Sequence, residues 1–428
     1  MEKLFNKIKD KEIREGVKAA IEQNLLPSRQ NRAYKGHFSI VADASAFGSE
    51  NTWPGLDSWQ MAGAYLLMGD AEPALGFFDF AKASQRKDGH IPFAVFKAEE
   101  VSNPLDRQTY VRGLNYPDDI FEYAPGGGYK TQKWIGLFRH WVTEDPLSTL
   151  APVCYALTAA EIYGHTKDKK WLIDNLPSAD RACRYLLAKK SPAGLIGGAG
   201  FYMEMPPRKE WDGVTQCYCY KAFSELRNLY SALNDAAGAF FWGTEADALK
   251  AAFENEFWNG AHYAEYIHPE HGAVDFHGFT DIDFAAIAFG LADESRCRAV
   301  WELLTKEPVF WWGDMPTQLV TKPYAYRDWE LARPVGFRSD RAFLYDVSAM
   351  GRVWYLEMLA ALRMKDYGRI KEAVKLVCRR GLADGGFWYE RYYLMQDNTV
   401  FPGGPKKYCE YPAVLLRTVL GNLNIFTK

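Results

Sequence analysis

The sequence contains no apolar run long enough to cross a membrane. Nothing in its 428 residues approaches eighteen consecutive apolar residues, and the opening stretch MEKLFNKIKDKEIREG has no apolar segment of signal-peptide length. Like charges never gather in a block and the net charge is −3, whereas a nucleic-acid-binding protein normally carries a basic stripe. We therefore expect a soluble, cytoplasmic protein that binds neither membranes nor nucleic acids.

Paired cysteines are also missing. The seven cysteines are odd in number and scattered, and no two of them form a CxxC pair, which favours buried, reduced thiols over disulfides or a zinc site. The histidines between positions 262 and 277, with Glu265 and Asp275 among them, fit no standard ligand spacing. Their HPEHG segment is typical of a turn between short strands, so we predict no metal site.

Helical periodicity dominates the chain. Apolar residues recur at helical spacing in nearly every long segment, and convincing alternating runs are few. Glycines at helix ends and prolines at helix starts, such as Gly69 and Pro73, support several boundaries. The pattern predicts about twelve helices, at 9–24, 56–69, 73–87, 147–164, 170–189, 215–236, 242–258, 281–291, 293–305, 342–364, 367–380 and 410–424.

The predicted helices fall into pairs. Short links such as 70–72 and 365–366 join the members of a pair, whereas successive pairs are joined by longer links, two of which are very long, at roughly 88–146 and 306–341. Six such hairpins suit an all-α fold, a closed (α/α)6 toroid whose long loops gather at one mouth and shape a pocket. Because no linker divides the sequence, we expect residues 1–428 to form one domain.

Aromatic residues are abundant, at 15% of the chain with 14 tryptophans. Flat rings suit a sugar, because its C–H faces stack on aromatics while its hydroxyl groups need hydrogen-bond acceptors. The aromatic loops therefore favour carbohydrate chemistry. The tryptophans in predicted loops, for which a binding cleft is a better explanation than a core, are Trp53, Trp211, Trp311, Trp312, Trp329 and Trp388.

Hydrolysis of a glycosidic bond commonly uses two carboxyl groups, one on each side of the sugar. An acid beside a tryptophan in a low-dielectric cleft has a raised pKa, as a general acid requires. The structural alternatives are a helix cap for an acid that precedes a helix, and a buried ion pair with a nearby arginine. Acids at helix ends among aromatic residues are Asp57 between Trp53 and Trp59, Glu204, Glu210 and Asp212 around Trp211, Glu390 in GGFWYERYY, and Glu410 in KKYCEYPAVLL.

The order of these motifs resembles a known family. An aromatic–Asp–Ser helix start, TWPGLDS, is followed by QRKDGHIP, a helix opening with DPL, an acid-bearing loop before VTQCYCYKAF, and GGFWYERYY. From about residue 50 to the C-terminus the chain resembles the (α/α)6-barrel glycoside hydrolases. It is closest to glycoside hydrolase family 63 and its members that hydrolyse glucosylglycerate or mannosylglycerate, and it is more distantly similar to glucoamylases and amylo-1,6-glucosidases.

The resemblance implies a role for each candidate. Asp212 matches the general acid, with Glu204 as the alternative, and Glu390 matches the general base, with Glu410 as the alternative. Two segments depart from the family pattern, since the general-acid loop reads MEMPPRKEWDG and a segment that usually carries a tryptophan reads YCEYPA. Asp57 matches a clamp on the sugar, and the other residues expected to bind substrate are Trp53, Trp59, Gln85, Trp211, Trp312, Trp388 and Tyr392.

The implied reaction is hydrolysis with inversion of configuration. Protonated Asp212 would donate to the departing glycosidic oxygen, while Glu390 would deprotonate a water that attacks the opposite face of the sugar. A small glucoside or short oligosaccharide is the expected substrate, as for an alpha-glucosidase, and the two proton transfers need no cofactor or metal. The oligomeric state stays open.

Three other functions fit the same barrel. A sugar epimerase or isomerase is disfavoured, because such enzymes usually rely on histidines placed on barrel helices and here the histidines lie mostly outside predicted helices. An unsaturated-uronide hydrolase is mildly disfavoured by the modest basic content of the loops. A non-catalytic carbohydrate-binding toroid would keep the aromatic pocket but would need only binding residues, not both Asp212 and Glu390.

Overall fold

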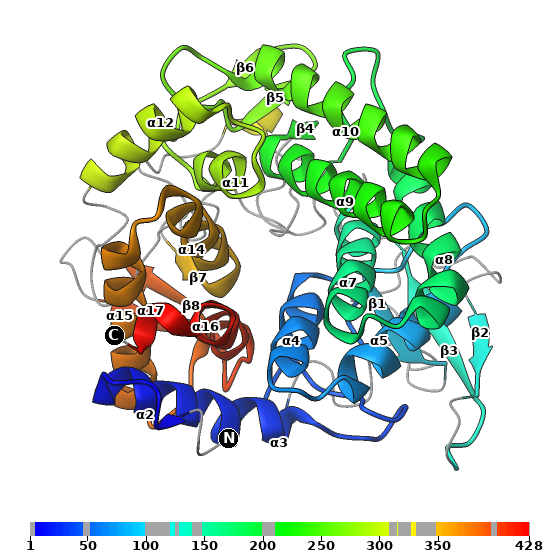
Figure 1. Cartoon of the computed structure of the whole chain (residues 1–428), viewed down its shortest axis with the longest axis vertical. Helices are drawn as coiled ribbons and strands as arrows, with labels where there is room; N and C mark the ends of the chain where they lie inside the picture. The colour runs from blue at the N-terminus through cyan, green and yellow to red at the C-terminus, as the bar shows by residue number, and fades with distance from the viewer. Residues whose placement is uncertain are drawn as a thin grey trace.

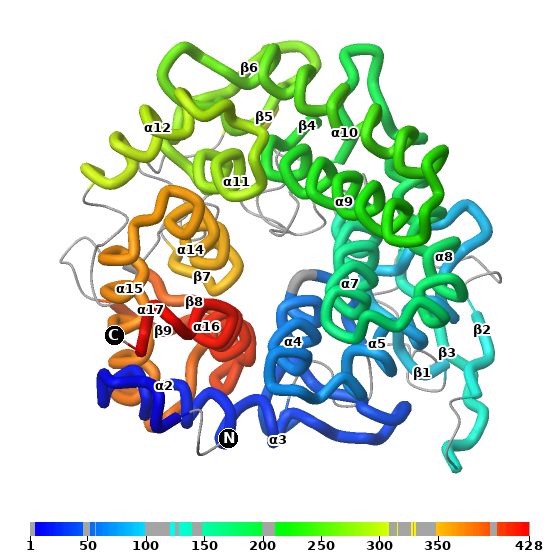
Figure 2. Tube along the Cα trace, in the orientation of Figure 1, coloured from blue at the N-terminus to red at the C-terminus, as the bar shows by residue number. Residues whose placement is uncertain are grey.

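Helices dominate the computed structural model of this protein, which Figures 1 and 2 show as a ring of paired helices. Two predicted substrate-binding or catalytic residues, Glu204 and Trp312, lie outside the described residues. The structure describes residues 5–45, 52–98, 120–124, 128–138, 148–198, 210–307, 315, 327–330, 348–394 and 400–427.

Six inner helices surround the axis of the ring in the described part of the chain (Figure 1). Each packs against the next, and the last packs against the first, so the ring is closed. The second of them buries every residue from Ala151 to Ala159, as expected of a helix enclosed on all sides. The inner helices are α4 (Leu56–Leu67), α7 (Leu150–Thr166), α9 (Gly213–Ala232), α11 (Asp281–Phe289), α14 (Gly351–Met364) and α16 (Glu410–Gly421).

Outer helices form a second layer and alternate with the inner ones along the chain. Five of them follow an inner helix through a short turn: α5 (Glu72–Ala83), α8 (Lys169–Leu187), α10 (Ala236–Phe257), α12 (Glu294–Lys306) and α15 (Tyr367–Ala383). The sixth comes from the N-terminal part of the chain and packs against α16: α2 (Lys11–Ala19), with the π-helical η1 (Ala20–Leu25) and α3 (Leu26–Ser28). The predicted (α/α)6 arrangement is confirmed, and each of the twelve predicted helices overlaps a helix of the structure.

The two ends of the described chain meet beside this sixth outer helix. The last short helix, α17 (Leu423–Phe426), follows α16, and the backbone N–H of Lys9 donates to the carbonyl of Phe426 at 3.2 Å. Figure 2 shows the N- and C-terminal segments side by side. The ring is therefore closed by helices from opposite ends of the sequence.

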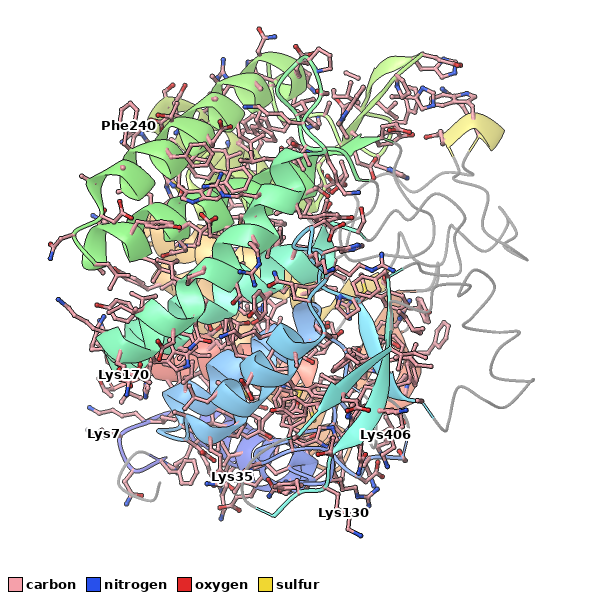
Figure 3. All side chains as sticks on the ribbon, turned by 90° about the vertical axis from the view of Figure 1, so that its right-hand side faces the viewer. Lys7, Lys35, Lys130, Lys170, Phe240 and Lys406 are labelled. Carbon is pink, nitrogen blue, oxygen red and sulfur yellow. The ribbon has the colours of Figure 1, made fainter. Side chains whose placement is uncertain are left out.

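All inner helices run in the same direction, because each outer helix returns antiparallel to its inner partner. We call the end of the ring formed by the N-termini of the inner helices the mouth. The links that lead into these N-termini carry small antiparallel sheets. Figure 3 shows strands gathered toward one end of the helices, where Lys406 is labelled, whereas Lys170 is labelled at the other end. The sheets are β1 (Ala94–Lys97), β3 (Gln132–Leu137) and β2 (Ile120–Tyr123); β4 (Trp211–Asp212), β5 (Tyr266–His268) and β6 (Gly272–Val274); and β7 (Ser348–Met350), β8 (Tyr389–Leu394) and β9 (Val400–Lys406).

Two local predictions are also confirmed. The HPEHG segment is the turn of the β5–β6 hairpin, in which His268 pairs with Gly272. All seven cysteines are buried and outside disulfides, as their scattered spacing indicates. The described helices include none that is both long and apolar enough to span a bilayer.

Candidate functional site

Three neighbouring inner helices bring charged side chains together at the mouth. Asp57 lies in the first turn of α4, Glu410 is the first residue of α16, and Arg352 is the second residue of α14. The exposed N–H groups and the dipole of a helix N-terminus favour a carboxylate there and disfavour a cation. Arg352 is therefore held by its partners rather than by its own helix.

Arg352 bridges the two carboxyl groups. Its Nη2 donates to Asp57 Oδ1 at 3.0 Å, and its Nε donates to Glu410 Oε1 at 2.8 Å. Gly351 permits this arrangement, because a Cβ at that position would lie only 2.9 Å from Glu410 Cγ. A larger residue at position 351 would push α14 away from α16 and open the bridge.

Burial changes the chemistry of Glu410. Its side chain is 0% exposed, and burial raises its pKa to about 8; the charges of Asp57 and Glu390 add to this rise, while Arg352 opposes it without cancelling it. Its Oε2 is buried and has no hydrogen-bond partner among the residues that the structure describes. Glu410 therefore keeps its proton at neutral pH and can act as a hydrogen-bond donor.

Glu390 lies on β8, in the sheet above the N-termini of α14 and α16. β7 runs directly into α14, and β9 precedes α16, so β8 is fixed to both helices. Tyr389 pairs with Lys406 but Arg391 pairs with Gly403, so the register shifts at Glu390. Such bulges occur next to active sites, where they redirect a side chain.

The turn of the chain opposite this bulge makes room for the Glu390 carboxyl group. Gly404 has φ +72°, and a Cβ there would lie 2.3 Å from Glu390 Oε2. Arg391 donates to the other oxygen, which places a cation next to the carboxylate. Because the charge of Glu390 also acts on Glu410, the predicted base and its alternative belong to one cluster with Asp57 and Arg352.

Asp212 lies across the mouth from this cluster. It caps α9, the third inner helix in ring order, whereas Glu410 begins the sixth. Its Oδ2 accepts from the backbone N–H of Thr215 at 2.7 Å and from the Thr215 hydroxyl at 2.8 Å, and the side chain is buried. One carboxyl oxygen of Asp212 therefore caps the helix, as the structural alternative to a catalytic role expected. These two hydrogen bonds also hold the carboxyl group in one orientation.

Two of the predicted aromatic residues are half-buried on strands or loops that lead into the inner helices. Trp211 precedes Asp212 on β4 and pairs with Ile267. Trp53 lies against Phe93 and Phe96 beside β1, with ring centroids 5.8 and 5.7 Å apart. Both rings keep part of their surface exposed.

Other predicted substrate residues lie deeper. Trp59 is 3% exposed, Trp388 is 0% exposed and Tyr392 is 1% exposed. The indole N–H of Trp388 donates to the Val377 carbonyl at 2.9 Å, and the Tyr392 hydroxyl donates to Asp384 at 3.2 Å. Trp388, just before β8, and Tyr392, on β8, are therefore buried in the core, and the structure does not place them on an open surface.

The side chain of Gln85 ties the QRKDGHIP turn to the outer layer. Its amide Nε2 donates to the carbonyls of Gly89 at 3.0 Å and Ser178 at 2.9 Å, and its Oε1 accepts from Arg181 at 2.9 Å. These bonds use the amide group to hold the loop between α5 and β1 against α8.

Sequence reasoning missed two members of the site, Arg352 and Tyr408. Tyr408 is buried just before α16, and burial, together with the charges of Asp57 and Glu390, raises the pKa of its hydroxyl group. The tyrosine stands in the quoted KKYCEYPAVLL segment, but nothing in its sequence neighbourhood distinguishes it from a core tyrosine. Arg352 lies in the first turn of α14, where a cation is disfavoured and therefore noticeable. The sequence predicts that this helix begins at 342, which puts Arg352 in its middle, so the signal is lost.

Two of the histidines near β5 and β6, His262 and His277, lie beside acids. His277 Nδ1 lies 2.5 Å from Glu265 Oε2, and both side chains are buried. His262 lies 3.4 Å from Asp275 and 3.6 Å from Asp283. Within the described ranges, no three His, Cys, Asp or Glu side chains gather in a way that could hold a metal ion.

Solved structures share the fold of this chain at low sequence identity. A GH63 mannosylglycerate hydrolase from Thermus thermophilus, in complex with glucose, matches with a TM-score of 0.60 and 13% identity over 92% of this chain and 98% of its own. A GH78 family rhamnosidase of Bacillus sp. GL1 matches with a TM-score of 0.57 and 14% identity over 97% of this chain and 35% of its own. A rhamnosidase from Klebsiella oxytoca with rhamnose bound matches with a TM-score of 0.57 and 11% identity over 96% of this chain and 64% of its own.

Comparison by sequence finds no related protein or family. No family model matches the chain, and no curated protein matches its sequence. The likeness to solved structures therefore shows the fold alone. This chain has the helical barrel fold of GH63 and GH78 glycoside hydrolases, which confirms the predicted resemblance at the level of the fold.

Proposed function

We propose that this protein is a glycoside hydrolase that cleaves a small glucoside or short oligosaccharide with inversion of configuration. The observation that carries the proposal is the placement of carboxyl groups on opposite sides of the mouth, with Asp212 before α9 and Glu390 above α16. Glycosidic bond hydrolysis requires this opposition, because one group protonates the leaving oxygen while the other acts from the other face. The fold likeness to a GH63 mannosylglycerate hydrolase supports the same class of reaction.

In the proposed reaction, Asp212 carries the proton that goes to the glycosidic oxygen, and Glu390 takes a proton from the attacking water. The alternative acid is Glu204. Glu390 suits the base better than Glu410, because a base must be ionised and burial raises the pKa of Glu410 to about 8. Inversion requires about 6.5–9.5 Å between the acid and base carboxyl groups, which leaves room for the water.

Asp57 is the proposed clamp on the sugar. Arg352 fixes one of its oxygens, and the side chain remains 16% exposed, so Asp57 can accept a hydrogen bond from a sugar hydroxyl group. The partly exposed rings of Trp53 and Trp211 are the proposed stacking surfaces. Gln85 contributes by holding the loop at the rim.

Hydrolysis of a panel of aryl glycosides and glucosylated small molecules tests the proposal. Asp212→Asn and Glu390→Gln are each expected to lower kcat by about 10²–10⁴-fold while sugar binding is retained. Asp366→Asn is the matched control, because Asp366 caps the outer helix α15 at the end opposite the mouth and accepts from the Arg369 N–H at 3.0 Å. The amide can still accept the cap hydrogen bond, so the variant makes the same acid-to-amide change away from the site and should leave kcat unchanged.

Three results would count against the proposal. Full activity in both Asp212→Asn and Glu390→Gln would remove the assigned acid and base. A first-formed anomer with the configuration of the substrate, detected by proton NMR, would exclude inversion. Binding of sugars by the unsubstituted protein without any turnover would instead indicate a carbohydrate-binding toroid.

A further inference from the structure

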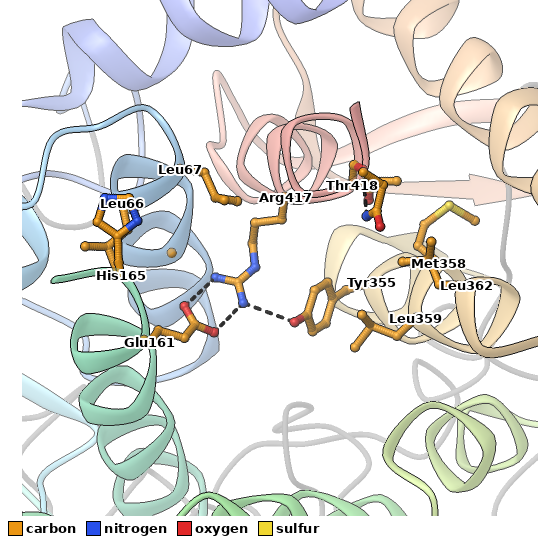
Figure 4. A pocket seen from close by; sticks show the side chains of 13 residues that line it. Leu66, Leu67, Glu161, His165, Tyr355, Met358, Leu359, Leu362, Arg417 and Thr418 are labelled. Atoms are coloured by element: carbon orange, nitrogen blue, oxygen red, sulfur yellow. Dashed lines mark hydrogen bonds and ion pairs between the residues drawn. The ribbon is translucent and has the colours of Figure 1, made fainter. Parts of the chain in front are cut away.

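A partly buried ion pair joins two inner helices that are not neighbours. Arg417 of α16 donates from Nη1 to Glu161 Oε2 at 2.9 Å and from Nη2 to Glu161 Oε1 at 2.5 Å, across the intervening helix α4. Figure 4 shows this two-point contact between α7 and α16, with Arg417 Nη2 also bonded to the Tyr355 hydroxyl at 3.0 Å. Such paired bonds fix geometry more strictly than a single ion contact.

Helix α4 makes space for the pair through a glycine. A Cβ at Gly63 would lie 1.4 Å from Arg417 Nη1 and 2.5 Å from Glu161 Oε2. The two side chains could move away from such a Cβ only by giving up their contact with each other. The pair passes over α4 only because residue 63 has no side chain.

The same pair holds Trp59, one turn closer to the mouth on α4. The indole N–H of Trp59 donates to Glu161 Oε1 at 2.9 Å, and the Arg417 guanidinium carbon lies 4.9 Å from the centre of its ring. A cation over an aromatic face adds attraction to the hydrogen bond. Glu161 and Arg417 therefore fix both the edge and the face of the indole.

The first turn of α4 is held by the bond from Arg352 to Asp57 and by this indole anchor. Its N-cap residue is Gly55, which makes no side-chain cap hydrogen bond. Asp57, the proposed clamp, lies in this turn, two residues before Trp59. A helix start without a capping side chain frays more easily, so contacts such as the indole anchor matter for the position of this turn.

A pocket of about 320 Å³ lies on the other side of the ion pair, at the end of the ring opposite the mouth (Figure 4). Glu161, Arg417 and Tyr355 border it, and apolar side chains such as Leu66 and Met358 form its walls. These three polar side chains are bonded to one another, so they are committed to the structure of the barrel rather than to a ligand.

We propose that Arg417 and Glu161 are positioning residues, which anchor the first turn of α4 through Trp59 and so hold Asp57 in place for the sugar. The inference rests on the proposed function for its kinetic consequence, but not for the anchoring contact. Because Asp57 binds substrate, loss of the anchor acts mainly on KM.

Steady-state kinetics and a double-mutant cycle test the kinetic part. Arg417→Met and Trp59→Phe are each expected to raise KM about tenfold, and the double variant should be no worse than either, because both remove the same anchor. Arg417→Lys keeps a cation and should recover part of the loss. Additive effects of the two substitutions on KM would overturn the inference.

Arg369→Met is the matched control. Arg369 Nε donates to Glu357 Oε1 at 2.7 Å in a buried ion pair between α15 and α14, away from Trp59. This variant should lose stability yet keep its KM. An equal rise in KM would show that any buried ion pair has this effect and would also overturn the inference.

The indole N–H of Trp59 provides a readout that is independent of activity. In protein labelled with ¹⁵N-tryptophan, this NMR signal is the one missing from Trp59→Phe. Arg417→Met and the milder Glu161→Gln should shift it and speed its hydrogen exchange, whereas Arg369→Met should not. An unchanged signal would overturn the inference that Arg417 and Glu161 anchor Trp59. If the unsubstituted protein hydrolyses no glycoside, the proposed function fails, but this NMR measurement still tests the anchoring contact.

Discussion

Glu410 accepts a hydrogen bond from Arg352 at 2.8 Å, and yet burial raises its pKa to about 8. The guanidinium favours the ionised form of Glu410, but the loss of water and the nearby charges of Asp57 and Glu390 favour the protonated form and together outweigh it. Arg352 is shared with Asp57, so one cation faces several carboxyl groups. A proton on Glu410 relieves the excess negative charge of this cluster.

The first prediction concerns the pH dependence of stability. The ordinary pKa of Glu410 is 4.5 and its folded value is about 8, so the folded state binds the extra proton and is favoured at low pH. Relative to Glu410→Gln, the free energy of unfolding should fall as pH rises from about 4.5 to about 8, by a few kcal/mol at most. Urea denaturation at several pH values measures this difference, and parallel profiles for the two proteins would contradict it.

The second prediction is that Arg352→Met destabilises the protein strongly. The substitution leaves Asp57 and Glu410 without their shared cation, and removal of one partner of a buried ion pair costs about 3–5 kcal/mol. The loss should be smaller at pH 5 than at pH 8, because Glu410 is then protonated and needs no counter-charge. Denaturant unfolding at both pH values checks the sign, and an equal loss at both would exclude the charge explanation.

Arg352→Lys is the informative comparison for that experiment. A lysine keeps the positive charge but cannot donate from two separate nitrogens of a rigid fork to Asp57 and Glu410 at once. We expect it to recover much of the stability at pH 8 and little of kcat/KM. Full recovery of both would mean that only charge matters at this position.

The third prediction concerns the thiols. All seven cysteines are buried, and burial raises the pKa of thiols such as Cys378 and Cys409, so almost none of the reactive thiolate forms near neutral pH. A colorimetric thiol reagent at pH 8 should label none of them in the folded protein and all seven in denaturant. Rapid labelling of the folded protein would contradict the burial.

The helices could be predicted from the sequence because their signals are local. Apolar spacing and terminal residues placed one helix at 215–236, and α9 spans Gly213–Ala232. The error at 342–364 has a physical reason, since β7 at Ser348–Met350 runs straight into α14 and its three residues are too short to show alternation. The strands β5 and β6 are expected from their HPEHG turn, whereas the longer strands β3, β8 and β9 are not predicted from the sequence.

The site could be predicted only in part. The acids Asp57, Glu390 and Glu410 stood out by their aromatic neighbours, and the structure brings them to one cluster. The partnership of Arg352 with Asp57 joins residues 295 positions apart and has no local signature. Aromatic content also fails to separate a cleft from a core, because Trp388 fits so tightly that a Cβ at Gly381 would lie 2.1 Å from its ring.

The last prediction concerns the glycine that faces Glu390. A Cβ at Gly404 would lie 2.3 Å from Glu390 Oε2, so Gly404→Ala must move the carboxyl group of the proposed base. A displacement of this size in a reacting group lowers kcat by about 10²-fold. The substitution also strains the backbone, because Gly404 has φ +72°, which costs an alanine about 1–2 kcal/mol.

Gly385→Ala separates these two effects. Gly385 has φ +83° and nothing within 4 Å of its would-be Cβ, so an alanine there causes the same kind of backbone strain without touching Glu390. Both variants should lose similar stability in denaturant unfolding, and only Gly404→Ala should lose turnover. If Gly385→Ala lost as much kcat as Gly404→Ala, strain alone would explain the effect. If neither lost any, the position of Glu390 would not matter for the reaction, and the base would have to be sought elsewhere in the cluster.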